Sequence, residues 1–261
     1  MQSIPGILKK IVKTKEVEVN AILNMRGEFI STISNISPAM SFESALKNNG
    51  INSIIAEVKK ASPAAGLIDS EFNYIDIATE YEKAGVSAIS VLTDRDYFKG
   101  DVEYLKQIRK VVNIPILRKD FVISELQILE ARAIGSDSFL LIVRILTDSQ
   151  LKEFICLGRE LGMEPLVEVF DMYDLERAIV SDAKIIGINN RDLNSFTVDV
   201  NNSISLYAQI PKGVISVSES GIASVEVCRN LYSTGFNTLL IGEFFMRSKN
   251  KKRLIHEIIS H

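Results

Sequence analysis

The 261-residue chain has no tryptophan, and it has only two histidines and two cysteines. His256 and His261 lie at the C-terminal end, so the His-rich ligand sets that transition-metal catalysis usually uses are missing. Cys156 and Cys228 are far apart and form no Cys-x-x-Cys pair, which argues against a zinc site and a disulfide framework. We therefore expect two buried thiols, no bound metal, and acid–base chemistry that rests on Lys, Glu and Asp.

The chain also lacks a strong charge imbalance and a long hydrophobic run. Thirty basic and 33 acidic side chains leave a formal net charge of -3, with no long block of either sign. This balance argues against a nucleic acid partner. The longest apolar stretch, around Phe139 to Val143, is far shorter than the ~20 residues that cross a bilayer, and the first residues lack the apolar segment of a secretory signal. We expect no membrane association and a cytoplasmic location.

Two nucleotide-binding motifs are missing as well. The sequence contains neither the Gly-rich dinucleotide fingerprint nor the P-loop pattern. Their absence argues against NAD and ATP, so we expect an enzyme that uses no cofactor.

What the sequence does contain is a regular alternation of two kinds of segment. Short, β-branched apolar runs recur at residues 54–58, 88–92, 114–117, 138–143, 165–169, 185–189, 214–218 and 238–242. The segments between them have apolar residues at helical spacing, as Leu151, Phe154 and Ile155 do. This alternation predicts an α/β protein with a parallel sheet covered by helices. The number of runs favours a closed (β/α)₈ TIM barrel, with an open sheet as the alternative.

The N-terminal segment does not follow this repeat. Residues 5–25 and 41–49 have helical patterns, and Ser37-Pro38 begins a loop before the second of them. We predict an N-terminal helical extension over residues 1–50 that packs on the barrel. Residues 51–261 are then the barrel itself, a single catalytic domain.

Polar side chains occur at the expected carboxyl ends of several strands, where the active site of a barrel forms. The main candidates are Glu57, Lys59, Lys119, Glu168, Asn189 and Glu219. Alternation along the first strand places its glutamate and its lysine on the same face. For any one of these residues, a solvated strand end or a structural ion pair is a sufficient explanation. Because they come from several strands at one end, and buried charges without a function are costly, we predict a shared catalytic site.

Glycines follow the last two predicted strands, Gly221 in SESGIAS and Gly242 in LIGEFFM. A glycine permits close approach of the backbone, and the start of the following helix offers N–H groups to an anion. Tight turns would explain either glycine alone, but they explain the pair less well. Ser62, after the first strand, would add a hydroxyl or simply begin a loop. We predict that this rim binds the phosphate of a small-molecule substrate.

Several segments together resemble the indole-3-glycerol-phosphate synthases of tryptophan biosynthesis, and they span nearly the whole chain. The most specific are IIAEVKKASPAAG and ILRKDFVISELQI; the others are SVLTDRDYFKGD, LLIVRIL, PLVEVFD, GINNRDLNSF, SESGI and IGEFFMR. Asp101 departs from the family pattern, which commonly has Ser after F-x-G. The resemblance implies a carboxy-lyase that cyclises 1-(2-carboxyphenylamino)-1-deoxy-D-ribulose 5-phosphate to indole-3-glycerol phosphate, with loss of CO₂ and water. We expect it to be a monomer or a weak homo-oligomer.

The resemblance also implies catalytic roles. Lys119 would be the general acid on the substrate carbonyl, with Lys59 as a second lysine near the ring-forming centre and the phosphate. Glu57 and Glu168 would take and relay protons. We further expect Lys59 and partial burial to lower the pKa of Lys119.

The same resemblance implies substrate contacts for the remaining site residues. Asn189 and Glu219 would hold the sugar hydroxyls and the lysine network, and Arg191 and Ser220 would shape the mouth. The phosphate would be held by Ser62, Gly221, Gly242 and Glu243, the last two through backbone N–H groups. The apolar slot for the anthranilate ring would be formed by Phe98, Phe121, Leu140 and Leu193.

Two other functions remain open at this point. The first is a Schiff-base aldolase or related lyase, in which Lys119 or Lys59 is a covalent nucleophile that borohydride would trap. The second is a phosphate-binding barrel without activity, a sensor or a scaffold. The complete set of acidic and basic groups argues against the second.

Overall fold

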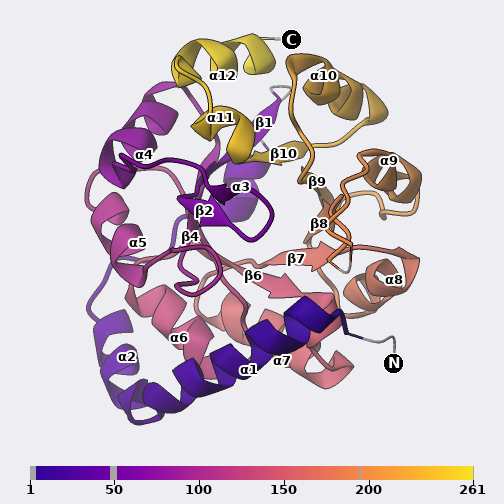
Figure 1. Cartoon of the computed structure of the whole chain (residues 1–261). Coiled ribbons are helices and arrows are strands. Elements are labelled where there is room, and N and C mark those ends of the chain that lie inside the picture. The colour runs from indigo at the N-terminus through magenta and orange to yellow at the C-terminus, as the bar shows by residue number, and fades with distance from the viewer. Residues whose placement is uncertain (1–3, 48–51, 194, 261) are drawn as a thin grey trace.

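The computed structural model describes residues 4–47, 52–193 and 195–260, and its centre is a closed barrel of parallel strands (Figure 1). In chain order the barrel strands are β1 (Ser53–Val58), β4 (Ala88–Leu92), β5 (Ile116–Lys119), β6 (Ser138–Ile142), β7 (Leu166–Val169), β8 (Ile185–Asn189), β9 (Ile215–Glu219) and β10 (Thr238–Ile241). Each pairs with the next along the chain, and β10 pairs with β1 to close the barrel. The predicted (β/α)₈ barrel is therefore confirmed, and the open sheet is excluded.

Helices surround the barrel. They are α4 (Tyr74–Lys83), α5 (Val102–Arg109), α6 (Glu125–Ala133), α7 (Asp148–Glu160), α8 (Met172–Val180), α9 (Asn201–Tyr207), α10 (Val225–Thr234), α11 (Glu243–Met246) and α12 (Lys251–Ile259), with a 3₁₀ turn, η2 (Val143–Ile145), after β6. Most begin at a polar side chain that accepts a hydrogen bond from the first turn. Asp101 does so for α5, accepting from the N–H of Glu103. The residue that departs from the family pattern thus still caps a helix, as Ser would.

The strands are buried along almost their whole length because they contribute to two separate cores. One set of side chains, including Ile54, Ile89 and Val167, packs outward against the helices. The alternate set, including Ile55 and Leu166, fills the inside of the barrel. Because both faces of each strand are buried, the strand sequences are continuous apolar runs and do not alternate between apolar and polar residues.

The third predicted strand is displaced by two residues, because β5 covers 116–119 instead of 114–117. Pro115 has no N–H to donate, so regular pairing begins only after it. Lys119 is consequently the last residue of the strand, and its carbonyl accepts a hydrogen bond from the N–H of Thr93. A short hairpin that the sequence did not predict, β2 (Ala61–Ser62) with β3 (Gly66–Leu67), follows β1.

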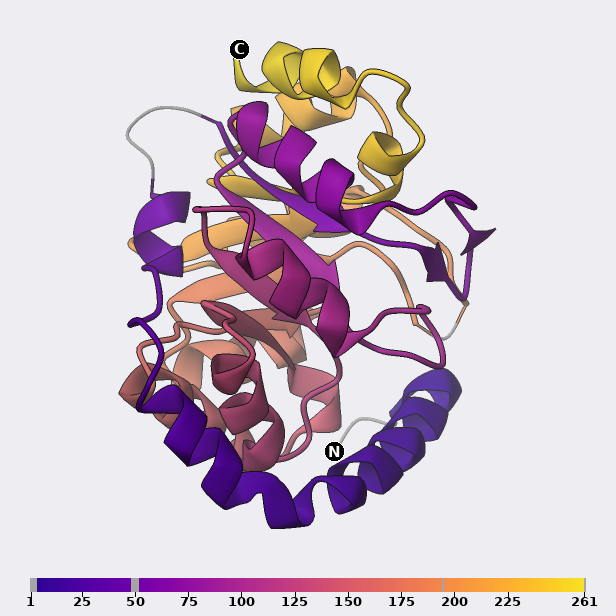
Figure 2. The same ribbon diagram turned by 90° about the vertical axis from the view of Figure 1, so that its left-hand side faces the viewer.

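The N-terminal segment forms α1 (Gly6–Ala21), η1 (Leu23–Met25), α2 (Arg26–Ile33) and α3 (Phe42–Leu46). Figure 2 shows α1 and α2 as two arms that meet at η1 along one side of the molecule. Helix α1 lies within the predicted 5–25, whereas α2 was not predicted. Residues 48 and 49 of the second predicted helix, and the predicted boundary between extension and barrel, lie outside the described residues.

The prediction for the cysteines is wrong for one of them. Cys228 is buried, but Cys156 on α7 is exposed. It follows Ile155, and each step along a helix turns by about 100°, which carries Cys156 off the face that Leu151, Phe154 and Ile155 bury.

Within the described residues, no helix combines the length and the apolar character that a membrane span requires.

Gly158 provides a test of the packing between α7 and β6. A Cβ at this position would lie 2.6 Å from the ring of fully buried Phe139. We expect Gly158→Ala to lower the free energy of unfolding by about 1–3 kcal/mol, measured by urea denaturation. Gly27 on α2 is the control, since a Cβ there would contact nothing. Gly27→Ala should leave stability unchanged or raise it by about 0.5 kcal/mol, and equal losses in both variants would contradict this account.

Candidate active site

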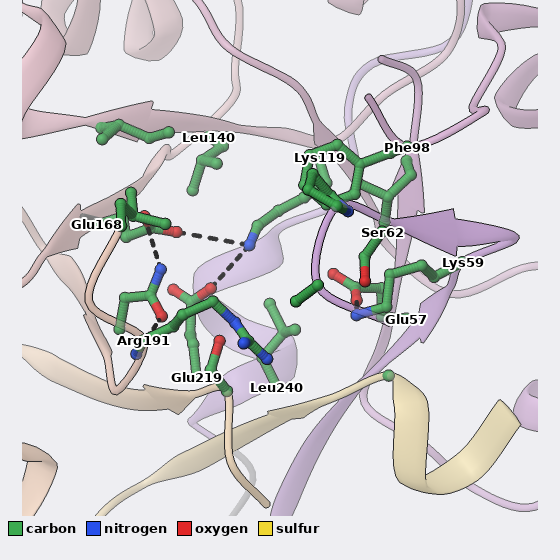
Figure 3. A pocket seen from close by; sticks show the side chains of 18 of the residues that line it. Glu57, Lys59, Ser62, Phe98, Lys119, Leu140, Glu168, Arg191, Glu219 and Leu240 are labelled. Carbon is green, nitrogen blue, oxygen red and sulfur yellow. Dashed lines mark hydrogen bonds and ion pairs between the residues drawn. The ribbon is translucent and has the colours of Figure 1, made fainter. Parts of the chain in front are cut away.

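A pocket opens at the carboxyl ends of the barrel strands (Figure 3). Every residue that the sequence analysis assigned to the site lines it: Glu57, Lys59, Ser62, Phe98, Lys119, Phe121, Leu140, Glu168, Asn189, Arg191, Leu193, Glu219, Ser220, Gly221, Gly242 and Glu243. Parallel closure explains this convergence, because all the strands end at the same rim.

At the centre of the pocket lies the ammonium of Lys119, on the last residue of β5. Its Nζ donates a hydrogen bond to Glu219 Oε2 at 2.8 Å and lies 3.5 Å from Glu168 Oε2. Asn189 Nδ2 donates to the other oxygen of Glu168 at 3.1 Å. Figure 3 shows the ammonium between the two carboxylates. Side chains from four strands thus form one connected polar network.

Glu57 of β1 and Lys59, which follows the last residue of that strand, form a second polar pair on the other side of the pocket, as Figure 3 shows. Lys59 Nζ lies 2.5 Å from Glu57 Oε1, as alternation along the strand predicted. Burial alone would raise the pKa of Glu57, but Lys59 and Lys119 outweigh burial and hold this pKa below its ordinary value. Glu57 is therefore ionised near neutral pH.

The expected lowering of the Lys119 pKa is wrong. Burial by itself would lower it, but the carboxylates of Glu219, Glu168 and Glu57 raise the pKa of Lys119 well above its ordinary value. Lys59 does not act on it as expected because Lys59 pairs with Glu57. Lys119 is therefore held as a cation, which suits it to stabilise negative charge on a nearby oxygen.

Glu219 has the opposite perturbation. Burial raises its pKa to about 7, and the neighbouring Glu168 carboxylate adds to this, although Lys119 opposes both. One of its oxygens points toward Gly187 on β8, and a Cβ at Gly187 would collide with it. The glycine makes room for this carboxyl inside the barrel. Glu219 is therefore able to exchange a proton near neutral pH.

Backbone geometry shapes the rim where a phosphate was predicted. Ser220 and Gly221 both have positive φ, 69° and 75°, which turns the chain sharply after β9. A Cβ at Gly242 would collide with the Glu57 carboxylate and lie 2.9 Å from Lys59 Nζ, so this glycine lets the backbone approach the Lys59 ammonium. Across the rim, Ser62 Oγ accepts the N–H of Ala65 at 3.1 Å. The rim combines a lysine, a hydroxyl and closely approaching backbone.

The opposite wall of the pocket is apolar. Phe98 and Phe121 pack with ring centroids 6.0 Å apart, next to Leu140 and Leu193 in one hydrophobic cluster. Arg191 and Phe196, which follow β8, also line the pocket, and Arg191 Nη1 donates to the carbonyl of Phe196 at 3.1 Å. The wall forms a slot suited to a flat ring.

Sequence reasoning missed the contribution of helix α1. Ile7, Leu8 and Ile11 line the pocket and belong to the same hydrophobic cluster as the slot. Their spacing marks one face of a helix, which predicts burial but does not indicate what the face covers. Only the path of the chain across the barrel mouth brings this face to the site.

Comparison with known proteins gives a consistent family assignment. A family model described as indole-3-glycerol phosphate synthase matches residues 8–258. A protein of that name from Acetivibrio thermocellus is 51% identical over 222 residues, which is 85% of each chain. Another from Desulfotalea psychrophila is 42% identical over 256 residues, covering 97% of this chain and 98% of the relative.

Solved structures that share the fold have much lower sequence identity. A 3-hexulose-6-phosphate synthase from Salmonella typhimurium superimposes with a TM-score of 0.65 at 10% identity, covering 80% of this chain and 97% of its own. A thiamine phosphate pyrophosphorylase from Pyrococcus furiosus has a TM-score of 0.61 at 12% identity, covering 84% and 96%. At such identities the likeness concerns the barrel fold alone.

The perturbed pKa of Glu219 can be measured directly. We expect its carboxyl carbon, followed by ¹³C NMR, to titrate with a midpoint at about 7. Lys119→Met removes the cation that opposes the increase, so the midpoint should move higher still. Lys212→Met, at an exposed position away from the pocket, should leave it unchanged. A midpoint at the ordinary glutamate value in the unmodified protein would refute this description of the network.

Proposed function

The chain belongs to the indole-3-glycerol phosphate synthase family, and we propose that this pocket catalyses the ring closure by general acid–base chemistry. The substrate, 1-(2-carboxyphenylamino)-1-deoxy-D-ribulose 5-phosphate, becomes indole-3-glycerol phosphate with loss of CO₂ and water, a step of tryptophan biosynthesis. Formally this makes the enzyme a carboxy-lyase that needs no cofactor.

The three parts of the substrate correspond to three parts of the pocket. The anthranilate ring suits the apolar slot of Phe98, Phe121, Leu140 and Leu193. The phosphate suits the rim of Ser62, Gly221, Gly242 and Glu243, with Lys59 as the adjacent cation. The carbonyl then lies between slot and rim, where the Lys119 ammonium is found.

In the first step, the ring carbon that bears the carboxylate attacks the carbonyl carbon, and a carbon–carbon bond forms. The carbonyl oxygen becomes negative, and we propose that Lys119 stabilises it and donates the proton that makes it a hydroxyl. The raised pKa of Lys119 fits this role, because the alkoxide is basic enough to take a proton from a lysine that stays charged before the reaction. The bond to the carboxylate then breaks, CO₂ leaves, and its electron pair restores the aromatic ring.

The second step removes water. The hydroxyl leaves with a proton from an acid, while a base takes a proton from the adjacent carbon, and the double bond of the indole forms. We propose Lys59 and Glu57 for this exchange, since they form a close acid–base pair at the rim. Glu168 and Glu219 relay protons to and from Lys119, and Asn189 orients Glu168. Arg191 and Ser220 shape the mouth.

The observation that supports the proposal most strongly is the placement of Lys119. A lysine kept cationic by Glu219 and Glu168 stands between an apolar slot and a glycine-containing rim, inside a chain of this family. Such an arrangement matches a substrate that carries an aromatic ring at one end and a phosphate at the other.

Replacement of Lys119 tests the proposed general acid. We expect Lys119→Ala to lower kcat by about 10²–10⁴-fold, with a smaller change in KM, in an assay that follows indole fluorescence. Lys119→Arg should not restore the rate, because the longer, planar guanidinium cannot take the place of the ammonium between Glu219 and Glu168. If folded Lys119→Ala keeps its kcat and Lys59→Ala loses it, Lys59 is the general acid and the roles proposed for the two lysines must be exchanged. Borohydride inactivation in the presence of substrate would instead favour Schiff-base chemistry.

The phosphate rim predicts competitive inhibition by a simple dianion. Inorganic phosphate should raise the apparent KM without changing kcat, because it competes only for the end of the substrate that the rim holds. Ser62→Ala should weaken the binding of the substrate and the binding of inorganic phosphate by a similar factor. Purely noncompetitive inhibition would place the anion elsewhere.

A further inference from the structure

We propose that Lys15 is a positioning residue that holds helix α1 against the Phe98 turn, the segment of residues 94–98 after β4. The ring-binding slot is then already formed when the substrate binds. The proposal rests on the proposed function, because it takes this slot to be the site of the anthranilate ring. Lys15 itself does not line the pocket, so any effect on the reaction must pass through the elements that it joins.

Lys15 lies on α1, and its side chain is fully buried. Its Nζ is 2.9 Å from each of three carboxylates, those of Glu18, Asp94 and Asp120. The side chains of Asp94 and Asp120 are 0% and 2% exposed and belong to the chain that follows β4 and β5. If α1 moved away, the buried Asp94 carboxylate would lose the cation that pairs with it, which is strongly unfavourable.

The two aspartates also bind the backbone of the aromatic residues of the slot. Asp94 Oδ1 accepts the N–H groups of Tyr97 and Phe98 at 2.8 and 3.0 Å, which fixes the turn that presents Phe98. Asp120 Oδ1 accepts the N–H of Phe121 at 2.8 Å and directly follows Lys119. Each aspartate that faces the Lys15 ammonium therefore also binds the backbone of a residue whose ring belongs to the slot.

Helix α1 contributes to the slot from the same face. Ile11, Leu8 and Ile7 precede Lys15 by four, seven and eight residues, which places all four side chains on one stripe of the helix. The apolar part of the stripe lines the pocket, and the lysine anchors it. Thr14 adds a hydrogen bond to Tyr97 Oη at 3.1 Å.

The two aspartates depend on Lys15 to different degrees. Asp120 has other partners, namely Arg118 and the hydroxyl of Thr93. For Asp94, by contrast, Lys15 is the only cation paired with it in the part of the chain that the structure describes. Loss of Lys15 should therefore loosen α1 and the Phe98 turn, while the end of β5 that carries Lys119 stays in place.

The test uses full-length Lys15→Met, which keeps the length of the side chain and removes its charge. We expect KM to rise roughly tenfold while kcat stays within about threefold of the unmodified enzyme. The reason is that only a fraction of the Lys15→Met molecules would have the slot assembled before the substrate binds. The matched control is Lys13→Met, at an exposed position on the same helix, which should change neither constant. A folded Lys15→Met with an unchanged KM overturns the proposal, and so does a fall in kcat alone.

Hydrogen exchange of the same proteins gives a readout that does not require turnover. Amides of α1 should exchange faster in Lys15→Met than in the unmodified protein, while those of β7 remain equally protected. If the unmodified protein fails to convert the substrate, the proposed function fails, but the exchange experiment still decides whether Lys15 ties α1 to the barrel. Equal exchange rates of the α1 amides in both proteins would overturn the proposal that Lys15 holds α1 against the barrel.

A second variant is available if Lys15→Met does not fold. Asp94→Asn keeps an oxygen for the N–H groups of Tyr97 and Phe98 and removes the negative charge that faces Lys15. It should show the same rise in KM and the same faster exchange of α1, to a smaller extent because Asp120 still binds Lys15. Unchanged values for both quantities in this variant would also overturn the proposal.

Discussion

The centre of this pocket depends on the ion pairs that the Lys119 ammonium forms with Glu219 and Glu168. Glu219 and Glu168 lie almost fully buried at the ends of their strands, and carboxylates removed from water in this way repel one another. Burial raises the pKa of Glu219, the neighbouring Glu168 adds to this, and Lys119 compensates only part of the two effects, so this pKa is still raised to about 7. A charge cluster that is incompletely neutralised costs stability, and it supplies groups that hold and release protons near neutral pH.

Strand β5 connects this cluster to a second one. Lys119 points into the pocket. Its neighbour Arg118 pairs with Glu130 of α6, and Asp120, at the edge of the pocket, pairs with Lys15 of α1. Period-2 alternation along β5 thus separates Lys119, which faces the substrate pocket, from Arg118, which pairs with a helix outside the barrel. The same few residues of β5 therefore bear on both the chemistry and the closure of the apolar wall by α1.

Much of this arrangement was predictable from local patterns. The apolar runs gave the barrel strands, and alternation gave the Glu57–Lys59 pair, because both depend on neighbours within a few residues. Local patterns were less reliable at Pro115, where a missing N–H delays β5, and at Cys156, whose exposure depends on a single step around α7. The direction of the Lys119 pKa was wrong for another reason, since it depends on carboxylates from distant strands that only the folded barrel brings within 3.5 Å.

The sequence by itself determined the order of the barrel strands, the closure expected from their number, and the set of polar residues at the strand ends, because these follow from short-range periodicity and a shared strand direction. The tertiary structure alone decided which partner each charge has and what the apolar face of α1 covers. Lys15 illustrates the difference. In the sequence it is one of several lysines on an amphipathic helix, and only the crossing of α1 over the barrel mouth buries it against Asp94 and Asp120. Burial and pairing of charges depend on contacts between residues far apart in the chain, and no local pattern contains them.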